Sequence, residues 1–502
     1  MLSMNTEKKL RIGDVSDNGQ VTIVDEDKLC YLVKSVSKGA VGLRTISKAL
    51  LREFVEYMGQ HPETPANEVR FKISGQSDID KYEYGYGATL SVMANMVLGK
   101  IKVQHTNPVV SKSVVPNLSV NLSYRPYITA IKSKPFLLLA GISGTGKSRI
   151  VRELARACWD EGSEEYKAQK PKNFEMVQVK PNWHDSSELI GYVSRVSGSP
   201  VFVAGDFLKF VAKAWENPEV PYFLCLDEMN LAPVEQYFAE YLSVVESRKC
   251  DENGVVTTDP ILKKSDEQWY FDLTAQLTTN DEIRSQFNTD GIAIPQNLIV
   301  VGTVNMDETT FSFSRKVLDR AMTIEMNEVD LYGGLTDRYE KMGKLEAGNL
   351  IGTAVEGVDV YQENKDVCDT ALRYLEAVNG QLEGTPFKVA YRTRNEFLLY
   401  VVNNLPYNKD KDGNEIPQNE VIARALDEIT SMKILSRIEG DSDKIGTRLD
   451  KLTTTVAEQL KAVSGKEYSE KKNDGEKVCS VSLAKLKEMK DRLSSGYTSF
   501  WS

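Results

Sequence analysis

The chain has 502 residues, of which 41% are hydrophobic and 27% are charged, and its mean hydropathy is −0.35. These values are typical of a folded globular protein with room for about three domains, and they exclude collagen-like, low-complexity and wholly disordered classes. The formal net charge of −10 argues against a protein whose whole surface coats nucleic acid.

The sequence carries no signal for export, membrane insertion or a metal centre of cysteines and histidines. The N-terminus has no apolar signal segment, and no apolar run reaches the length of about 18 residues that a membrane span needs. The 6 cysteines stand singly, and the 3 histidines lie far apart in the sequence. We therefore expect a cytoplasmic protein without membrane contact, disulfide scaffold or zinc site.

Residues 1–115 are predicted to form a small α+β module. Short β-rich runs at Val21–Val24 and Val69–Ile73 predict strands. Apolar residues at helical spacing predict helices over Val41–Tyr57 and Leu90–Leu98. We expect this module to recognise a target or a partner, because the later motifs account for the rest of the chain.

A linker is predicted at residues 116–126, which are rich in Ser, Asn and Pro. The charge differs on its two sides, since residues 1–130 carry 16 Lys and Arg residues against 13 Asp and Glu residues. The N-terminal part is therefore slightly basic, although the whole chain is acidic.

Residues 127–330 are predicted to form an α/β subdomain with a parallel sheet. Buried strands are expected at Phe136–Ala140, Tyr222–Leu226 and Leu298–Thr303, with a helix over Lys147–Asp160. This alternation of apolar strands and amphipathic helices is typical of a doubly wound sheet with helices on both faces.

Three further segments complete the predicted organisation. Residues 251–295 are polar and mostly aperiodic, so we expect an insertion on one face of the sheet. Residues 331–465 are predicted to form a helical lid, and residues 466–502 a tail with a last helix near Leu483–Leu493. The terminal Phe500 and Trp501 are expected to pack in a core, with insertion into a neighbouring subunit as the alternative.

A phosphate-binding loop is the strongest motif of the sequence. Residues 141–148 follow the pattern G-x-x-x-x-G-K-S between a predicted strand and a predicted helix. In such a loop, backbone N–H groups and the helix N-terminus surround phosphate oxygens, and the lysine neutralises their charge. The residues expected to bind the nucleotide are Gly141, Ser143, Gly144, Thr145, Gly146, Lys147 and Ser148.

Two carboxylates end the next predicted buried strand, about 80 residues downstream of the loop. Asp227 is expected to bind Mg²⁺ together with the hydroxyl of Ser148. Glu228 is expected to orient or deprotonate the attacking water. A solvated strand end is the usual role of such a pair, but its position after a phosphate loop favours a nucleotide-hydrolysing site.

Two more residues are candidates for the catalytic step. Asn305 ends the third predicted strand and is expected to hold the attacking water, with a strand-end cap as the alternative. Arg320 follows a short predicted helix and is expected to reach the γ-phosphate in a neighbouring subunit. The alternative for Arg320 is a local salt bridge to Asp319 or Glu325.

These motifs, in this order, resemble an AAA+ ATPase, and longer matches resemble the McrB-type motor of modification-dependent restriction systems. The resemblance covers roughly residues 127–460 and is absent before about residue 115. It is carried by the phosphate loop and by five further segments, which are Val179–Asp185, Leu189–Tyr192, Pro221–Ala232, Tyr237–Arg248 and Gly302–Thr310.

The resemblance implies a ring, usually a hexamer, with nucleotide at each subunit interface. It makes Asn305 the sensor-1 residue and Arg320 the arginine finger. Arg392 matches the position of a sensor-2 arginine that binds nucleotide, although the neighbouring Arg394 competes for this role. Arg315 stands where the family pattern has proline, either as a second interface arginine or as a tolerated change, and we favour the latter.

The function that the resemblance implies is Mg²⁺-dependent hydrolysis of GTP or ATP in a DNA restriction complex with an McrC-like nuclease subunit. The motifs do not decide whether the nucleotide is GTP or ATP. No nuclease is expected within this chain, because Glu470, Lys471 and Lys472 lie in a polar stretch without a preceding strand. The alternative is a MoxR-like remodelling ATPase that acts on protein clients.

The N-terminal module is the expected site of DNA selection. Tyr82, Tyr84 and Tyr86 alternate with charged residues and glycines and are candidates for a pocket that holds a flipped base. The favoured alternative is that these tyrosines lie on one face of a strand and pack against a core.

Overall fold

The computed structural model divides the chain into two units, one covering Met1–Val114 with Glu252–Val255 and the other Val115–Asp251 with Val256–Ser502. Each unit is described by itself. The described residues are 14–16, 21–26, 30–37, 40–61, 86–98, 103–105 and 120–501, without residues 197, 252, 253, 307–310, 330, 333, 334, 336–338, 340, 411, 412 and 473.

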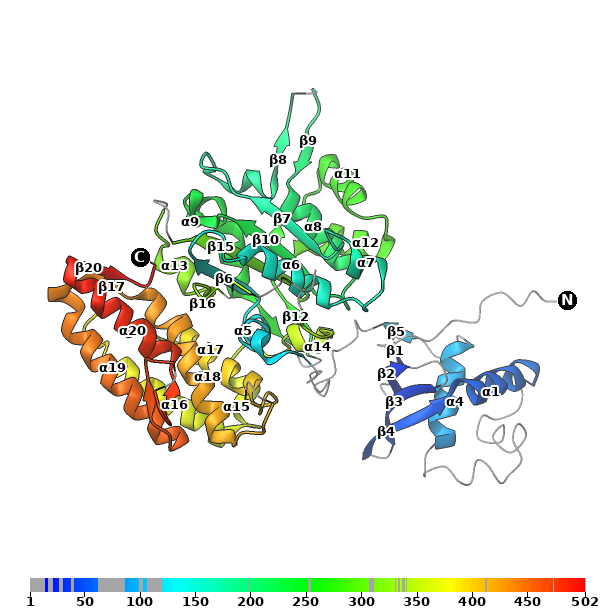
Figure 1. Cartoon of the computed structure of the whole chain (residues 1–502). Helices are drawn as coiled ribbons and strands as arrows, with labels where there is room; N and C mark the ends of the chain where they lie inside the picture. The colour runs from blue at the N-terminus through cyan, green and yellow to red at the C-terminus, as the bar shows by residue number, and fades with distance from the viewer. Residues whose placement is uncertain are drawn as a thin grey trace. The chain divides into compact units, whose positions relative to one another are not determined.

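The described residues of the first unit form a five-stranded antiparallel sheet and two helices, which confirms the α+β prediction (Figure 1). Its strand order is β4-β3-β2-β1-β5. Phe54, Met58 and Met93 from the helices pack with Val33 of the sheet in one apolar core. The elements are β1 (Asp14–Ser16), β2 (Val21–Glu26), β3 (Cys30–Ser37), β4 (Ala40–Ser47), α1 (Lys48–Gln60), α4 (Tyr86–Val97) and β5 (Val103–His105).

The helix predicted over Val41–Tyr57 is wrong in its first part, which is strand β4. Val41, Thr45 and Ile46 are β-branched, and β4 pairs with β3 along its whole length, so cross-strand packing outweighs the helical spacing. Tyr86 begins helix α4 rather than standing on a strand. Tyr82, Tyr84 and the strand predicted at Val69–Ile73 lie outside the described residues.

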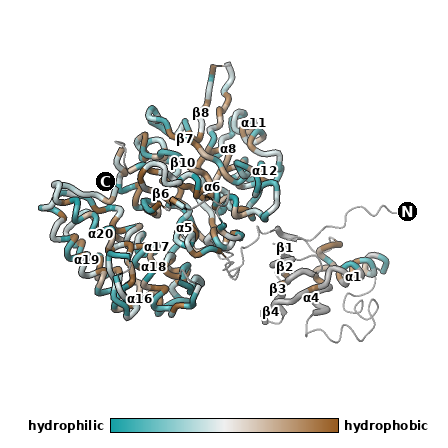
Figure 2. Tube along the Cα trace, in the orientation of Figure 1, coloured by the Kyte–Doolittle hydropathy of each residue, from teal (hydrophilic) through white to brown (hydrophobic). Residues whose placement is uncertain are grey.

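The centre of the second unit is a parallel sheet in the order β16-β6-β15-β10-β7. Its strands are β6 (Phe136–Gly141), β7 (Phe174–Gln178), β10 (Tyr222–Asp227), β15 (Leu298–Asn305) and β16 (Met322–Glu325). The three predicted strands are confirmed, and β7 and β16 are added at the edges. All residues of β6 are buried, and Figure 2 shows hydrophobic residues along β6 and β10.

Alternate residues of β6 belong to two apolar cores on opposite faces of the sheet. Leu137 and Leu139 pack in the core that also contains α6 (Lys147–Ala157) and the lid helices. Phe136 and Leu138 pack in the core that contains α8 (Asp206–Glu216). Burial on both faces explains why the strands read as continuous apolar runs.

The predicted insertion at residues 251–295 contains two helices that the mostly aperiodic sequence did not indicate, α11 (Gln268–Leu277) and α12 (Asp281–Asp290). Each buries few apolar residues, such as Leu273 and Phe287, so the helical period is weak in the sequence. The hairpin of β8 (Gly191–Ser194) and β9 (Val201–Ala204) projects from the sheet (Figure 1).

Shorter elements connect the sheet strands. They are η1 (Leu122–Tyr124), α5 (Arg125–Ser133), α7 (Glu164–Lys167), η2 (Ser186–Glu188), η3 (Met229–Leu231), α9 (Val234–Tyr237), α10 (Ala239–Val244), η4 (Val245–Ser247), β11 (Lys249–Cys250), β12 (Val256–Thr257), β13 (Pro260–Leu262), β14 (Ile292–Ala293) and α13 (Arg315–Leu318).

A helical lid follows the sheet, as predicted. Its main helices are α16 (Lys365–Gly380), α17 (Tyr391–Asn404), α18 (Gln418–Lys433), α19 (Ser442–Ser464) and α20 (Val481–Arg492). Smaller elements are α14 (Ala347–Leu350), α15 (Val358–Tyr361), η5 (Leu435–Arg437), β17 (Glu439–Asp441), β18 (Tyr468–Ser469), β19 (Val478–Cys479), η6 (Leu493–Ser495) and β20 (Tyr497–Ser499). Within the described part of the chain, none of the helices combines the length and apolar character of a membrane span.

The C-terminal tail is built into the lid rather than appended to it. Leu486 and Met489 of α20 are fully buried in the lid core, and β20 pairs with β17. Phe500 is also fully buried there, which confirms the predicted core packing. The Trp501 ring lies 5.1 Å from that of Phe313, and its indole N–H donates to the Ser436 carbonyl.

Candidate functional site

The phosphate loop connects β6 to α6 and needs its glycines for two reasons. Gly144 and Gly146 have φ values of +83° and +84°, a region that residues with a side chain rarely adopt. A Cβ at Gly141 would stand 2.5 Å from the carbonyl oxygen of Met326, so the strand and the following chain approach too closely for any side chain. The N-terminus of α6 therefore faces an open loop of backbone N–H groups.

Lys147 lies across this loop. Its Nζ donates to the carbonyl oxygens of Gly141 and Ile142 at 3.0 and 2.7 Å, and 5% of the residue is exposed. Thr145 closes the same turn by donating its hydroxyl to the Ile142 carbonyl. An ammonium held in this position can exchange these carbonyl acceptors for phosphate oxygens that enter the loop.

Ser148, Asp227 and Thr303 meet beside the loop. The Ser148 hydroxyl donates to Oδ1 of Asp227 at 2.5 Å, and the Thr303 hydroxyl donates to the same oxygen at 2.8 Å. Ser148 is the second residue of α6, Asp227 ends β10 and Thr303 lies near the end of β15. Hydroxyl and carboxylate oxygens are the donors that Mg²⁺ prefers, so Ser148 and Asp227 fit the predicted metal site.

Glu228 has an unusual backbone conformation, with φ of +53°. Among the described residues it is the single non-glycine residue with positive φ, and such strain is concentrated at functional sites. Its N–H donates to the Thr303 hydroxyl at 3.0 Å, and Oε1 accepts from the Asn305 amide at 3.3 Å. The structure thus brings Ser148, Asp227, Glu228 and Asn305 together at the carboxyl edge of the sheet.

Arg320 lies in a different place. Its Nε donates to the Leu242 carbonyl at 2.8 Å, and one terminal nitrogen donates to the Lys316 carbonyl at 2.7 Å. Its salt-bridge partner is Glu246 at 3.6 Å, rather than the expected alternatives Asp319 and Glu325. Two backbone acceptors therefore fix the direction of the guanidinium.

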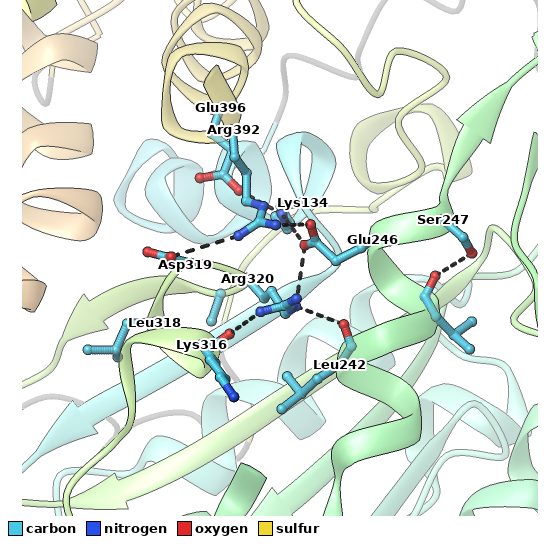
Figure 3. Close-up of polar contacts among 12 residues, drawn as sticks. Lys134, Leu242, Glu246, Ser247, Lys316, Leu318, Asp319, Arg320, Arg392 and Glu396 are labelled. Carbon is cyan, nitrogen blue, oxygen red and sulfur yellow. Dashed lines mark hydrogen bonds and ion pairs between the residues drawn. The ribbon is translucent and has the colours of Figure 1, made fainter. Parts of the chain in front are cut away.

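Glu246 forms ion pairs with three cationic side chains, as Figure 3 shows. Oε1 lies 3.9 Å from Lys134 and 3.6 Å from Arg320, and Oε2 pairs with Arg392. Arg392 also lies 3.8 Å from Asp319. A cavity of about 250 Å³ lies beside this cluster and is lined by Lys134, Glu246 and Arg392, among others.

The cation cluster is at the amino edge of the sheet, opposite the phosphate loop. Met322 of β16 is paired with Leu137 of β6, whereas Asn305 of β15 is paired with Gly141. Arg320 precedes Met322 and shares Glu246 with Lys134, which precedes β6. At roughly 3.3 Å of rise per residue, the length of β6 separates the two edges by about 20 Å.

The structure also places the three other arginines that the sequence singled out, Arg392, Arg394 and Arg315. Arg392 pairs with Glu246 and Asp319 at the amino edge of the sheet. Its expected role in nucleotide binding stays a prediction. Arg394 instead contacts Asn395 and the Tyr391 ring. Arg315 packs over Phe387 and donates to the Pro386 carbonyl in the lid.

Thr303 and Glu246 were missed by sequence reasoning. Thr303 stands two residues before Asn305 on the same face of β15, and this period of two is a usable signal. Glu246 gives no such signal, because its three cations come from separate segments of the sequence.

Two family models match the chain. Residues 136–322 match the AAA domain of the dynein-related subfamily, which spans β6 to β16 and includes every residue of the carboxyl-edge site. Residues 351–497 match a domain of unknown function, DUF8727, which coincides with most of the helical lid.

One curated relative is the type IV methyl-directed restriction enzyme EcoKMcrB subunit of Escherichia coli (strain K12). It is 25% identical over 239 residues, covering 44% of each chain, so this chain spans less than half of that relative's length. A solved structure, the SCCmec type IV Cch active helicase, is 11% identical and covers 93% of this chain and 80% of its own, with a TM-score of 0.25.

Proposed function

We propose that this chain is a P-loop AAA+ protein of the McrB type that hydrolyses GTP or ATP with Mg²⁺ as the motor ring of a restriction complex, as its similarity to the AAA domain and to the EcoKMcrB subunit supports. The nucleotide phosphates would lie in the loop at residues 141–148, with Lys147 turned from the loop carbonyls to their oxygens. Ser148 and Asp227 would hold Mg²⁺, which supplies charge neutralisation to the β- and γ-phosphates.

The hydrolytic step is assigned to Glu228 and Asn305. Glu228 would accept the proton of the attacking water at a carboxylate oxygen, and Asn305 would orient that water through its amide. Their present contact, from the Asn305 amide to Oε1 at 3.3 Å, supports a shared target between them.

The position of Arg320 is the observation that carries the proposal of a ring. A finger at the amino edge lies about 20 Å along the sheet from its own phosphate loop, by the rise of roughly 3.3 Å per residue. It therefore serves a nucleotide only if a second subunit brings its carboxyl edge to this face. We extend the same role to Arg392, which Glu246 holds beside Arg320.

The complex that this motor serves is proposed from the curated relative, a subunit of a methyl-directed restriction enzyme. We propose a hexamer that acts with an McrC-like nuclease subunit and selects DNA through residues 1–115. The nuclease is assigned to the partner. No observation in the described residues favours the MoxR-like alternative.

The test is a subunit-mixing experiment. Arg320→Ala should keep nucleotide affinity and lose hydrolysis by about three orders of magnitude or more, the known worth of an arginine finger. Mixing with Lys147→Ala subunits should restore part of the activity, because some interfaces then combine an intact loop with an intact finger. Lys316→Ala, which removes a nearby cation but keeps the carbonyl that Arg320 uses, is the matched control and should behave as the parent. Absence of rescue at every mixing ratio would contradict the proposal.

A further inference from the structure

Lys433, at the end of lid helix α18, reaches the turn that carries Arg320. Its Nζ donates to the carbonyl oxygens of Leu318 and Asp319, both at 3.1 Å, and of Ala321 at 2.8 Å. These three carbonyls flank Arg320 on both sides in the sequence. None of the Lys433 side chain is exposed to solvent.

The charge of Lys433 is balanced inside the protein. Glu396 of α17 pairs with Lys433 at 2.7 Å and with Lys134, just before β6, at 2.6 Å. Burial lowers the pKa of Lys433 to about 8, and Glu396 opposes that fall, so the side chain is an ammonium at neutral pH. An ammonium has three N–H donors, which match the three carbonyl acceptors.

Filling of the core alone does not require a lysine at this position. A buried ion pair is often no more stabilising than an apolar side chain of similar volume, so Met would fill the space at lower cost. The lysine adds directional bonds to a turn outside the lid. Arg437, just after α18, makes a second lid contact to the same turn by pairing with Asp319 at 3.2 Å.

We propose that Lys433 is a positioning residue, which ties the turn carrying Arg320 to the lid so that the lid position sets the direction of the finger. This inference rests on the proposed action of Arg320 on a neighbouring subunit. The lid and the finger then move as one body, and a shift of the lid in one subunit changes hydrolysis in the next.

The first test is Lys433→Met in the full chain. Nucleotide affinity should stay within about twofold of the parent, because Lys433 is remote from the phosphate loop. Hydrolysis should fall by about 100-fold, the usual effect of a 1 Å displacement of a catalytic group. Lys461→Met, an exposed lysine of α19 that pairs with Glu467 at the surface, is the matched control and should hydrolyse at the parental rate.

Mixing separates positioning from a structural defect. Lys433→Met subunits keep their phosphate loop, so Lys147→Ala subunits with intact fingers should restore hydrolysis. Arg320→Ala subunits should not, because neither partner then supplies a working finger. Hydrolysis by Lys433→Met at the parental rate would overturn the inference. So would a result in which Lys147→Ala subunits rescue Arg320→Ala but do not rescue Lys433→Met. Failure of both rescues would instead overturn the proposed ring.

Two more variants distinguish a positioning role of Lys433 from a general loss of folding stability. Glu396→Gln removes the ion pair of Lys433 but leaves its three carbonyl acceptors, so hydrolysis per folded subunit should fall less than in Lys433→Met. Equal losses in Glu396→Gln and Lys433→Met would mean that destabilisation, not positioning, is responsible. If Lys433→Met does not fold, Arg437→Gln removes the second contact to the turn and should show a smaller loss with the same rescue. Parental hydrolysis in Arg437→Gln would then count against the inference.

Discussion

Thr303 shows how one hydroxyl connects the two carboxylates of the candidate active site. It donates to Oδ1 of Asp227 and accepts from the backbone N–H of Glu228. The side chain that is proposed to bind the metal and the strained backbone of the proposed base are therefore both held by Thr303. Val has nearly the same shape as Thr but provides neither bond.

Thr303→Val should lower hydrolysis by about 10- to 100-fold, since it leaves a donor and an acceptor unpaired at a cost of about 1–3 kcal/mol. Nucleotide affinity should change less, because the loop is untouched. Thr323→Val on β16 is the control, since the Thr323 hydroxyl is buried without a hydrogen-bond partner and its loss should be neutral or stabilising. Single-turnover hydrolysis and nucleotide titration measure the two effects. Equal hydrolysis in both variants would contradict the role of Thr303.

Lys147→Ala and Glu228→Gln should separate binding from hydrolysis. Lys147→Ala removes the charge that pairs with phosphate and should abolish nucleotide binding. Glu228→Gln keeps the shape and the neighbouring Asp227 but cannot accept a proton, so bound nucleotide should accumulate without turnover. Filter binding and phosphate release measure these outcomes. Turnover by Glu228→Gln near the parental rate would remove Glu228 from the mechanism.

Lys433 makes a prediction about stability and pH. Its pKa in the folded chain is about 8, below the ordinary 10.5, so between these values the unfolded chain binds a proton that the folded chain has lost. The contribution of Lys433 to stability should therefore rise with pH from about 8 to 10. The melting temperature of the parent relative to Lys433→Met at pH 7, 8, 9 and 10 measures this. A difference independent of pH would mean that Lys433 keeps its ordinary pKa.

The residues of the carboxyl-edge site could be predicted because each stands in a local motif. Ser148, Asp227 and Asn305 follow buried strands, and parallel strands must bring their carboxyl ends to one edge. The partners of Arg320 and Arg392 could not be predicted in this way. Glu246 pairs with Lys134 just after α5, with Arg320 just after α13 and with Arg392 of α17, and no local period in the sequence records these contacts.

Among the elements, α20 illustrates how the tail is fixed to the lid. Asp427 of α18 is buried and accepts from the Ser480 hydroxyl at 2.6 Å and from the N–H groups of Val481 and Ser482 at 2.8 and 3.1 Å. These are the first N–H groups of α20, which have no partner inside the helix. A carboxylate from another helix therefore caps α20.

Asp427→Asn should loosen α20 by about 1–3 kcal/mol, because an amide cannot accept from all three donors and leaves a buried N–H unpaired. Hydrogen exchange of residues 480–501 should rise, whereas exchange in the phosphate loop should not. Asp443→Asn, at an exposed position in the first turn of α19, is the control and should leave exchange unchanged. Unchanged protection of α20 in Asp427→Asn would show that apolar packing alone holds the tail.

Elements with two buried faces were the most predictable, and amphipathic elements with weak periods were the least. The strands β6, β10 and β15 stand out as apolar runs, whereas α11 and α12 bury too few residues to reveal a helix. Strand β4 was predicted as helix, because Ile46, Leu50 and Phe54 share a spacing that continues across the boundary into α1. Pairing with β3, which is not local, decides that boundary.

At the scale of the whole molecule, the two edges of the parallel sheet carry different candidate functional residues. One edge carries the loop and the carboxylates, and the other carries Arg320, Arg392 and the lysine tie to the lid. In the proposed ring, the carboxyl edge of one subunit would face the amino edge of the next. The apolar core of the first unit shares none of the described residues with the two cores of the second. We therefore expect the proposed target selection to be separable from nucleotide hydrolysis.

DNA selection by the first unit is therefore testable by deletion. A chain that starts at Val115 should keep parental basal hydrolysis and lose DNA binding, whereas the full chain should prefer a methylated duplex to an unmethylated one. The contrast must be measured at near-physiological salt, because contacts to phosphate alone fade as salt rises, while a preference between the two duplexes reflects the bases. The remainder of the chain is acidic, with a net charge of −10 for the whole, and should not hold a duplex by general electrostatics. Equal DNA binding by both chains would place the DNA contact in the motor, and binding by neither would remove DNA from the proposed function while leaving nucleotide hydrolysis intact.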